Sequence, residues 1–311
     1  MDPLKLKSRT INGRREGPHL LVIGGVHGDE FEPMLACRQL LREVYADALR
    51  GKLTIVPIVN EPAFARCSRT GDDGLDLARV CPGDVNGSTT MQIAAELAKL
   101  IRNADYLVDL HTAGSRYELL PLAGYTLHSE KGVVERQRAM ARAFGLPLVW
   151  GTNPRFNGTS LAVARDEGVP AIYVENGGGA TYDRSRVNQV VYGCRQVMRL
   201  LGMLDEPLGQ HKPRYFVEDD RDNSGHLQRQ HPSPVAGFFE PDVDLGEVVT
   251  PEQIVGHVSD PLGDHRTPIV AGEAGTVLFL RRFPSVQVGD SLLAILPITS
   301  PGEVRYPREL S

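Results

Sequence analysis

Short apolar runs alternate with longer segments of helical spacing from about residue 19 to residue 204. Each run is bounded by glycine, proline or polar residues, as is typical of buried strands. The runs are HLLVIGGV, KLTIVPIVN, DYLVDLH, LPLVWG and PAIYVEN, at residues 19–26, 52–60, 105–111, 146–151 and 170–176. Strands that alternate with helices of these lengths predict an α/β fold, with a mixed, mostly parallel sheet covered by helices.

The segments between these runs carry the apolar periodicity of amphipathic helices. In the first of them, Pro33 suits the initial helical turn, and Gly51 is expected to close the helix after Leu49. The other predicted helices cover residues 90–104, 132–144, 159–168 and 186–204.

After the last predicted helix, helical periodicity ends and Pro, Gly and short β-like runs become frequent. Two stretches, at 234–258 and 269–296, both read V-A-G, a strand, V-x-x-G-[ED] and an apolar strand. Such a repeat predicts a C-terminal all-β domain, a small sandwich or half-barrel of two pseudo-symmetric halves. We therefore divide the chain into an α/β domain at 1–208 and a β domain at 209–311, with a linker or a partly ordered excursion expected at 205–232.

The charge and composition of the chain exclude several kinds of partner. The formal net charge is −5 and no long basic run occurs, so nucleic acid is not expected as a partner. No apolar run has the length of a membrane span, and the polar N-terminus lacks the apolar core of a signal peptide. The four cysteines show no paired metal-site spacing and are expected to be reduced and buried. We therefore expect a cytoplasmic protein without membrane contact; a homo-oligomer stays open, because β appendages often mediate subunit contacts.

Ionisable residues stand where three of the predicted strands end. His27 closely follows the first strand, with Glu30 three residues later. His111 ends the strand DYLVDLH, and Glu175 lies at the end of PAIYVEN. The carboxyl ends of parallel strands meet at one edge of a sheet, where ligands bind in open α/β folds. We therefore expect these four side chains to lie together.

Two histidines and a carboxylate are a common ligand set for hydrolytic zinc, which keeps a fourth position for water. His27 and Glu30 are close enough in sequence to reach one ion, and His111 would complete the set from an adjacent strand. Either motif alone more often marks a solvated helix start or a structural histidine. Their joint position at strand ends favours a metal site.

Hydrolysis at such a site also needs a general base and a cation for the developing oxyanion. Glu175 is the candidate base, because it follows a buried apolar run and precedes three glycines at 177–179 that allow close backbone approach. The polar loop 61–89 offers arginines for the oxyanion or for a substrate carboxylate. Within this loop, Arg66 is expected to be only a solvated charge.

Four motifs occur in the order of a known family: GGVHGDE, CSRTGDDGLDLARVCPGD, VDLHTAG and VPAIYVENGGG. Together they resemble the succinylglutamate desuccinylase/aspartoacylase family, relatives of the zinc carboxypeptidases. The resemblance covers residues 19–204, and the trailing β region is similar to that of the family's deacylase members. It implies a zinc carboxypeptidase-like fold with one Zn²⁺ per chain.

The resemblance also implies roles for individual residues. It places the zinc ligands on His27, Glu30 and His111. It places the general base on Glu175 and the arginine that polarises the scissile carbonyl on Arg69. An active hydrolase is expected, because the chain matches the family pattern at these positions.

A further element of the family, D-x-N-R, falls on DLAR at 76–79. By the resemblance, Asp76 would orient a zinc-binding histidine, and Asp109 is assigned a similar supporting role. Arg79 would hold a substrate carboxylate, and Asn60 is assigned to substrate binding as well.

The chain departs from the family pattern within this element. Ala78 stands where the family usually has asparagine, and Cys81 stands where it usually has phenylalanine. Alanine cannot donate the hydrogen bond that helps to grip a substrate carboxylate. The substrates of the family therefore do not transfer directly to this chain.

We expect a zinc-dependent hydrolase that cleaves the amide bond of a small N-acylated amino acid or amine. A carboxypeptidase-like peptidase is one alternative, because the same kind of site cleaves peptide bonds. A non-catalytic ligand-binding relative of the fold is another, and Ala78 is the feature that favours it. A biotin- or lipoyl-type carrier is excluded, because it needs an exposed lysine and residues 213–311 contain none.

Overall fold

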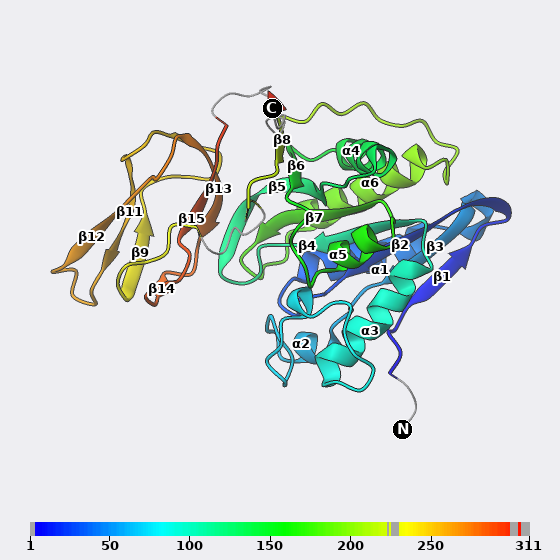
Figure 1. The fold of residues 1–311 in the computed structure, drawn as a ribbon, viewed down its shortest axis with the longest axis horizontal. Coiled ribbons are helices and arrows are strands. Elements are labelled where there is room, and N and C mark those ends of the chain that lie inside the picture. The colour runs from blue at the N-terminus through cyan, green and yellow to red at the C-terminus, as the bar shows by residue number, and fades with distance from the viewer. Residues whose placement is uncertain (1–3, 223, 225–229, 299–303, 306–311) are drawn as a thin grey trace.

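The computed structural model describes residues 4–222, 224, 230–298 and 304–305. An α/β part and a C-terminal β part lie side by side (Figure 1). The helices are α1 (Phe31–Glu43), α2 (Glu61–Ala65), α3 (Thr89–Arg102), α4 (Lys131–Phe144), α5 (Ser160–Asp166) and α6 (Arg184–Leu200), with the 3-10 turns η1 (Ala46–Ala48) and η2 (Leu77–Arg79). The strands up to residue 219 are β1 (Arg9–Asn12), β2 (Arg15–Gly24), β3 (Arg50–Val56), β4 (Tyr106–His111), β5 (Tyr117–Thr126), β6 (Leu148–Thr152), β7 (Ala171–Gly178) and β8 (Tyr215–Asp219). The later strands are β9 (Gly237–Pro241), β10 (Val248–Val249), β11 (Ile254–Ser259), β12 (Arg266–Val270), β13 (Gly275–Arg281), β14 (Ser285–Val286), β15 (Leu293–Leu296) and β16 (Val304–Arg305).

The main path of the largest sheet runs in the order β1-β3-β2-β4-β7-β5-β6-β8-β16. Strands β3, β2, β4 and β7 form one parallel block. Strands β5, β6, β8 and β16 form a second parallel block, and β5 is antiparallel to β7 where the blocks meet. The sheet is therefore mixed and mostly parallel, which confirms the predicted fold class.

Helices cover both faces of this sheet, and the burial of β2 explains why its sequence is apolar without interruption. Leu20 and Val22 pack in the cluster that includes α1, α4 and α6. Leu21 and Ile23 pack in the cluster that includes α3 and α5. Successive side chains of a strand point to opposite faces, so a strand covered on both sides needs an apolar residue at every position.

Two segments differ from the expectations drawn from the sequence. Helix α1 ends at Glu43 rather than near Leu49, because the chain becomes extended at Val44, whose N–H donates to the Leu40 carbonyl. The linker expected at 205–232 is wrong for β8, which is fully buried in the sheet beside β6. The division of the chain at residue 208 stays a prediction.

The cysteines are free, and three of them are buried as expected. Cys67 is exposed, so the expectation of burial is wrong at this position. Among the helices of the described ranges, none is both long enough and apolar enough to cross a membrane.

The C-terminal strands form two halves that exchange a short strand. In the first half β9 pairs with β11, and in the second half β13 pairs with β15, both antiparallel. The short strand β10 of the first half pairs with β13, and the short strand β14 of the second half pairs with β9. The pairing of each half with a short strand of the other is the arrangement expected of two pseudo-symmetric halves, which stay a prediction from the repeated V-A-G pattern.

The second of these halves is joined to the α/β sheet. Strand β13 pairs antiparallel with the first three residues of β5. Leu278 and Phe279 of β13 share an apolar cluster with Leu148 and Trp150 of β6. Both hydrogen bonds and apolar packing therefore hold the β part against the second parallel block of the sheet, which starts with β5.

His19 ties β2 to its surroundings at the point where the buried half of the strand begins. Its Nδ1 donates to the Asn103 carbonyl oxygen at 2.6 Å, and its Nε2 accepts from the Thr54 hydroxyl at 2.9 Å. Burial lowers the pKa of His19 below its ordinary value and outweighs the contact with Asn103, which raises it. The fold therefore favours the neutral imidazole.

We predict that His19 makes the fold less stable below about pH 6.5. The unfolded chain takes up a proton in this range while the folded chain resists it, so the free energy of unfolding falls as the pH decreases. Urea unfolding of the wild type and of His19→Gln from about pH 5 to pH 8 tests this. The variant should lose less stability on acidification, with no pH dependence of the difference above about pH 7; parallel profiles at low pH would contradict the prediction.

Candidate metal centre

Two neighbouring parallel strands deliver the expected ligands to one place. Gly24, the last residue of β2, is paired with Leu110 of β4, so the turn after β2 lies next to His111 at the end of β4. This turn passes through His27 and ends at Glu30, the residue that precedes helix α1. The structure therefore brings together the three residues that the sequence singled out.

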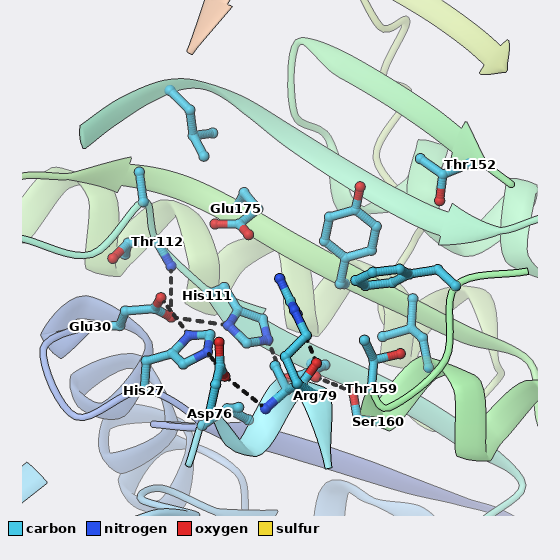
Figure 2. A pocket seen from close by; sticks show the side chains of 18 of the residues that line it. His27, Glu30, Asp76, Arg79, His111, Thr112, Thr152, Thr159, Ser160 and Glu175 are labelled. Atoms are coloured by element: carbon cyan, nitrogen blue, oxygen red, sulfur yellow. Dashed lines mark hydrogen bonds and ion pairs between the residues drawn. The ribbon is translucent and has the colours of Figure 1, made fainter. Parts of the chain in front are cut away.

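The two histidines converge on the Glu30 carboxylate (Figure 2). His27 Nδ1 lies 2.8 Å from Glu30 Oε1, and His111 Nδ1 lies 3.0 Å from Glu30 Oε2. The exposed fractions of His27, Glu30 and His111 are 4%, 1% and 9%, and a ligand atom from each lies within 4.8 Å of the others. Two imidazole nitrogens and a carboxylate oxygen in this arrangement fit a tetrahedral zinc with one position left over.

An aspartate faces the other ring nitrogen of each histidine. His27 Nε2 lies 3.2 Å from Asp76 Oδ1, and His111 Nε2 lies 2.9 Å from Asp109 Oδ1. The Ser160 hydroxyl donates to the second oxygen of Asp109 and steadies it. Such carboxylates fix the ring orientation of metal-binding histidines, which leaves both Nδ1 atoms for an ion. Asp76 and Asp109 therefore lie where the supporting role expected of them requires.

Opposite charge keeps Glu30 ionised inside the protein. Burial alone would raise the pKa of Glu30, but the charges and hydrogen bonds of His27 and His111 outweigh burial and hold the pKa well below its usual range. Burial would likewise lower the pKa of His111, but Asp109 and Glu30 raise it well above its usual range. The buried carboxylate thus depends on positive charge beside it, and a cation suits this donor set.

Glu175 lies beside the three candidate ligands. Glu175 lies on β7, where it is paired in register with His111 of the adjacent strand β4, and it lines the same cavity (Figure 2). Its Oε2 is shielded from solvent and has no hydrogen-bond partner among the described residues. Burial raises the pKa of Glu175 to about 8. A shielded carboxylate oxygen with a raised pKa is suited to accept and return a proton.

Arg69 reaches the site through Asp76. It donates from Nε and Nη2 to Asp76 Oδ2, at 3.0 and 2.9 Å, so that Asp76 connects the guanidinium to His27. Burial would raise the pKa of Asp76, but the hydrogen bond to His27 and the charge of Arg69 hold it well below its usual range. Arg69 lines the cavity with about a third of its side chain (32%) exposed, so this cation can also meet a bound molecule.

The short helix η2 adds Ala78 and Arg79 to the cavity wall. Arg79 Nη1 donates to the Ala78 carbonyl at 2.7 Å, and its guanidinium lies 4.9 Å from the centroid of the Phe156 ring. The side chain is exposed, so its charge is accessible to a ligand at the mouth of the cavity. The Ala78 methyl brings no hydrogen-bonding group to this wall.

Asn60 and Arg66 lie outside the cavity wall. Asn60 is fully buried, and its side chain accepts a hydrogen bond from the Ala63 N–H, so it caps helix α2. The substrate contact expected of Asn60 is therefore corrected, because capping uses its oxygen and buries the amide. Arg66 forms an exposed ion pair with Asp72 at 2.6 Å, in keeping with a solvated loop charge.

The candidate ligands open into a cavity of about 340 Å³. Its wall includes residues to which the sequence assigns no role: Trp150 and Thr152 of β6, Tyr173 of β7 and Phe279 of β13. Trp150 and Tyr173 lie within predicted buried strands, so a search for aromatic residues in those strands would have found them. Phe279 reaches the cavity only because β13 pairs with β5, a contact between distant segments that no local pattern signals.

The chain is similar in sequence to a family model and to a curated relative. Residues 16–201 match the family model described as the succinylglutamate desuccinylase/aspartoacylase catalytic domain. A curated relative is the N-alpha-acetyl-L-2,4-diaminobutyric acid deacetylase of Halomonas elongata, 31% identical over 298 residues. The match covers 93% of this chain and 85% of the relative.

Solved structures show the same similarity. A succinylglutamate desuccinylase from Silicibacter sp. TM1040 superimposes with a TM-score of 0.86 at 26% identity, covering 93% of this chain and 88% of that one. The product-bound ectoine utilization protein EutE (DoeB) from Ruegeria pomeroyi superimposes with a TM-score of 0.85 at 26% identity, covering 93% and 87%.

The turn that positions His27 depends on glycine at position 28. A Cβ at Gly28 would lie 2.0 Å from the carbonyl carbon of Ala63, so the backbone of α2 would have to move. We predict that Gly28→Ala lowers the free energy of unfolding by about 1 to 3 kcal/mol and weakens metal uptake. Urea unfolding and metal analysis measure the two effects.

Gly132→Ala in helix α4 is the matched control, because a Cβ at Gly132 meets nothing within 4 Å. It should keep stability and metal uptake near the wild-type values. A Gly28→Ala protein as stable as this control, with equal metal uptake, would contradict the prediction.

Proposed function

Because the chain belongs to the succinylglutamate desuccinylase/aspartoacylase family, we propose that it is a zinc-dependent hydrolase that cleaves the amide bond of a small N-acylated amino acid or amine. The observation that carries the proposal is the convergence of His27 Nδ1 and His111 Nδ1 on the buried Glu30 carboxylate, beside an unpaired oxygen of Glu175. The relative from H. elongata, named as a deacetylase of an N-acetylated diamino acid, supports the substrate class.

His27, Glu30 and His111 would hold one zinc ion per chain. Asp76 and Asp109 face the Nε2 atoms of the histidines, which leaves both Nδ1 atoms and the Glu30 carboxylate for the ion. The Glu175 oxygen without a partner among the described residues lies beside them and fits this assignment. Zinc bound there would supply Lewis-acid polarisation of water and of the amide carbonyl.

Glu175 moves the proton in this mechanism. Its carboxylate takes a proton from the attacking water and then delivers it to the leaving nitrogen, which departs as a neutral amine. The shielded Oε2 supports this role, because no group of the described chain competes for its lone pairs. Burial raises the pKa of Glu175, which favours return of the proton to the leaving group.

The two arginines of the cavity wall stabilise negative charge on the substrate. Arg69, held in place by Asp76, offers a guanidinium to the oxyanion that forms when water adds to the carbonyl. Arg79, exposed beside Phe156, pairs with a substrate carboxylate. Because Ala78 stands in place of an amide side chain, no second hydrogen bond from this position supports the contact between Arg79 and the carboxylate.

The position of the C-terminal part favours a small substrate over a peptide. Phe279 of β13 and Leu119 of β5 are paired in register and both line the cavity, so the C-terminal part contributes to its wall. A cavity of about 340 Å³ matches the volume of a small ligand rather than an extended chain. A carboxypeptidase-like activity is therefore the weaker alternative.

We predict that Glu175→Gln lowers kcat by about 10² to 10⁴-fold while zinc content stays unchanged, because Glu175 transfers a proton and does not bind the ion. Steady-state hydrolysis of an N-acetyl amino acid, with metal analysis of the same sample, measures both. Glu135→Gln, on the exposed side of α4, is the control and should keep full activity. A Glu175→Gln protein with near-normal kcat would remove Glu175 from the mechanism.

A substrate panel distinguishes deacylation from peptidase activity. We expect release of acid from N-acyl amino acids and little cleavage of tripeptides or longer peptides, because a cavity of about 340 Å³ matches a small ligand. Faster cleavage of peptides would support the peptidase. Metal binding without hydrolysis of any compound would favour a ligand-binding relative of the fold.

A further inference from the structure

The cavity has a second compartment, away from the candidate zinc ligands, with a distinct chemistry. Figure 2 shows Thr152 and Thr159 at the side of the cavity opposite His27 and Glu30. We define the aromatic compartment as the uncharged lining residues in this region, namely Thr126, Trp150, Thr152, Phe156, Thr159 and Tyr173.

Strand register explains how this compartment forms. Gly124 of β5 is paired with Tyr173 of β7 on one side and with Trp150 of β6 on the other. Residues paired in register point to the same face of a sheet, so the two aromatic side chains flank a glycine on one face. A Cβ at Gly124 would lie 2.3 Å from Tyr173 Cε1, which shows that the phenol ring occupies the space above Gly124.

Trp150 contributes a hydrogen-bond donor without a partner. The residue is 4% exposed, and its indole Nε1 is shielded from solvent with no hydrogen-bond partner among the described residues. Burial of an unpaired donor is costly, so such groups in native structures usually serve a purpose. Trp150 lines the cavity, and a molecule bound there can supply the missing acceptor once the indole ring turns Nε1 toward it.

The charges around the compartment indicate what kind of acceptor fits. The acidic residues of the cavity wall, Glu30, Asp76, Asp109 and Glu175, belong to the zinc side, and each interacts with the histidines or Arg69. The Arg79 guanidinium, next to Phe156, repels a cation and is assigned to the substrate carboxylate. An additional charged group in the aromatic compartment would lose its hydration without a counterion.

We propose that the aromatic compartment binds the side group of the substrate remote from the scissile amide, and that Trp150 Nε1 donates a hydrogen bond to a neutral oxygen acceptor on that group. The favoured ligands are then N-acyl compounds whose side group ends in a carboxamide, carbonyl or hydroxyl oxygen. Trp150 is a specificity-determining residue for the reaction, and the inference rests on the proposed function for the orientation of the substrate.

Four probes of similar size separate the chemistries. N-acetyl-L-asparagine carries a neutral acceptor, N-acetyl-L-leucine has nearly the same shape without one, N-acetyl-L-aspartate carries a carboxylate, and N-acetyl-L-2,4-diaminobutyrate carries an ammonium group. Calorimetric titration of the full-length Glu175→Gln protein measures binding without turnover. We expect the asparagine probe to bind about tenfold more tightly than the leucine probe, and more tightly than both charged probes.

The same titrations on Trp150 variants test the donor itself. In a Trp150→Phe protein the preference for asparagine over leucine should fall to about onefold, because the donor is absent. Trp150 is the single tryptophan of the chain, so replacement of tryptophan by benzothienylalanine during expression removes only this N–H and keeps the shape of the ring. This second variant keeps the test valid if Trp150→Phe does not fold.

The outcomes distinguish the inference from the proposed function. A tenfold preference that disappears in both variants supports the inference, even if the Glu175-containing protein releases no acetate; that result would overturn only the hydrolase. Preference for a charged probe, a preference that persists without the N–H, or binding of none of the four probes would overturn the inference. Acetate release at equal rates from all four probes would likewise overturn it and leave the hydrolase intact.

Discussion

The buried Glu30 carboxylate is the interaction on which the rest of the site depends. Its charge is tolerable inside the protein only because His27 and His111 approach it within 2.8 and 3.0 Å, and they can do so only because β2 and β4 are adjacent and parallel. The close turn at Gly28 sets the position of His27. The opposite charges of Glu30 and the two histidines stabilise the site without a metal ion. They also keep the three side chains close enough together to bind one.

The opposite side of the cavity follows from a different constraint. Strand β5 runs antiparallel to its neighbour β7, and it also pairs with β6 and with the C-terminal strand β13. These pairings bring β6 and β13 to the cavity. Those strands bring Trp150 and Phe279 to the cavity wall, and both side chains are uncharged.

Which site residues could be predicted from the sequence depends on how the strands that carry them are arranged. His27, Glu30 and His111 were predictable because each ends or follows a strand of a parallel sheet, and parallel neighbours share an edge. Phe279 was not, because antiparallel pairing of distant strands leaves no local pattern. An asparagine before Glu-Pro is a typical helix cap, and the structure shows Asn60 in this role rather than at the substrate. Strand β8 is a short buried run between polar segments, so its sequence resembles a linker.

Metal content measured together with hydrolysis tests the central claim most directly. The purified full chain would be analysed for zinc and assayed on an N-acetyl amino acid before chelation, after chelation and after zinc is restored. We expect about one zinc per chain, with hydrolysis that is lost on chelation and recovered on addition of zinc. A chain that takes up no zinc, or one that hydrolyses the substrate equally well after its metal is removed, would contradict the claim.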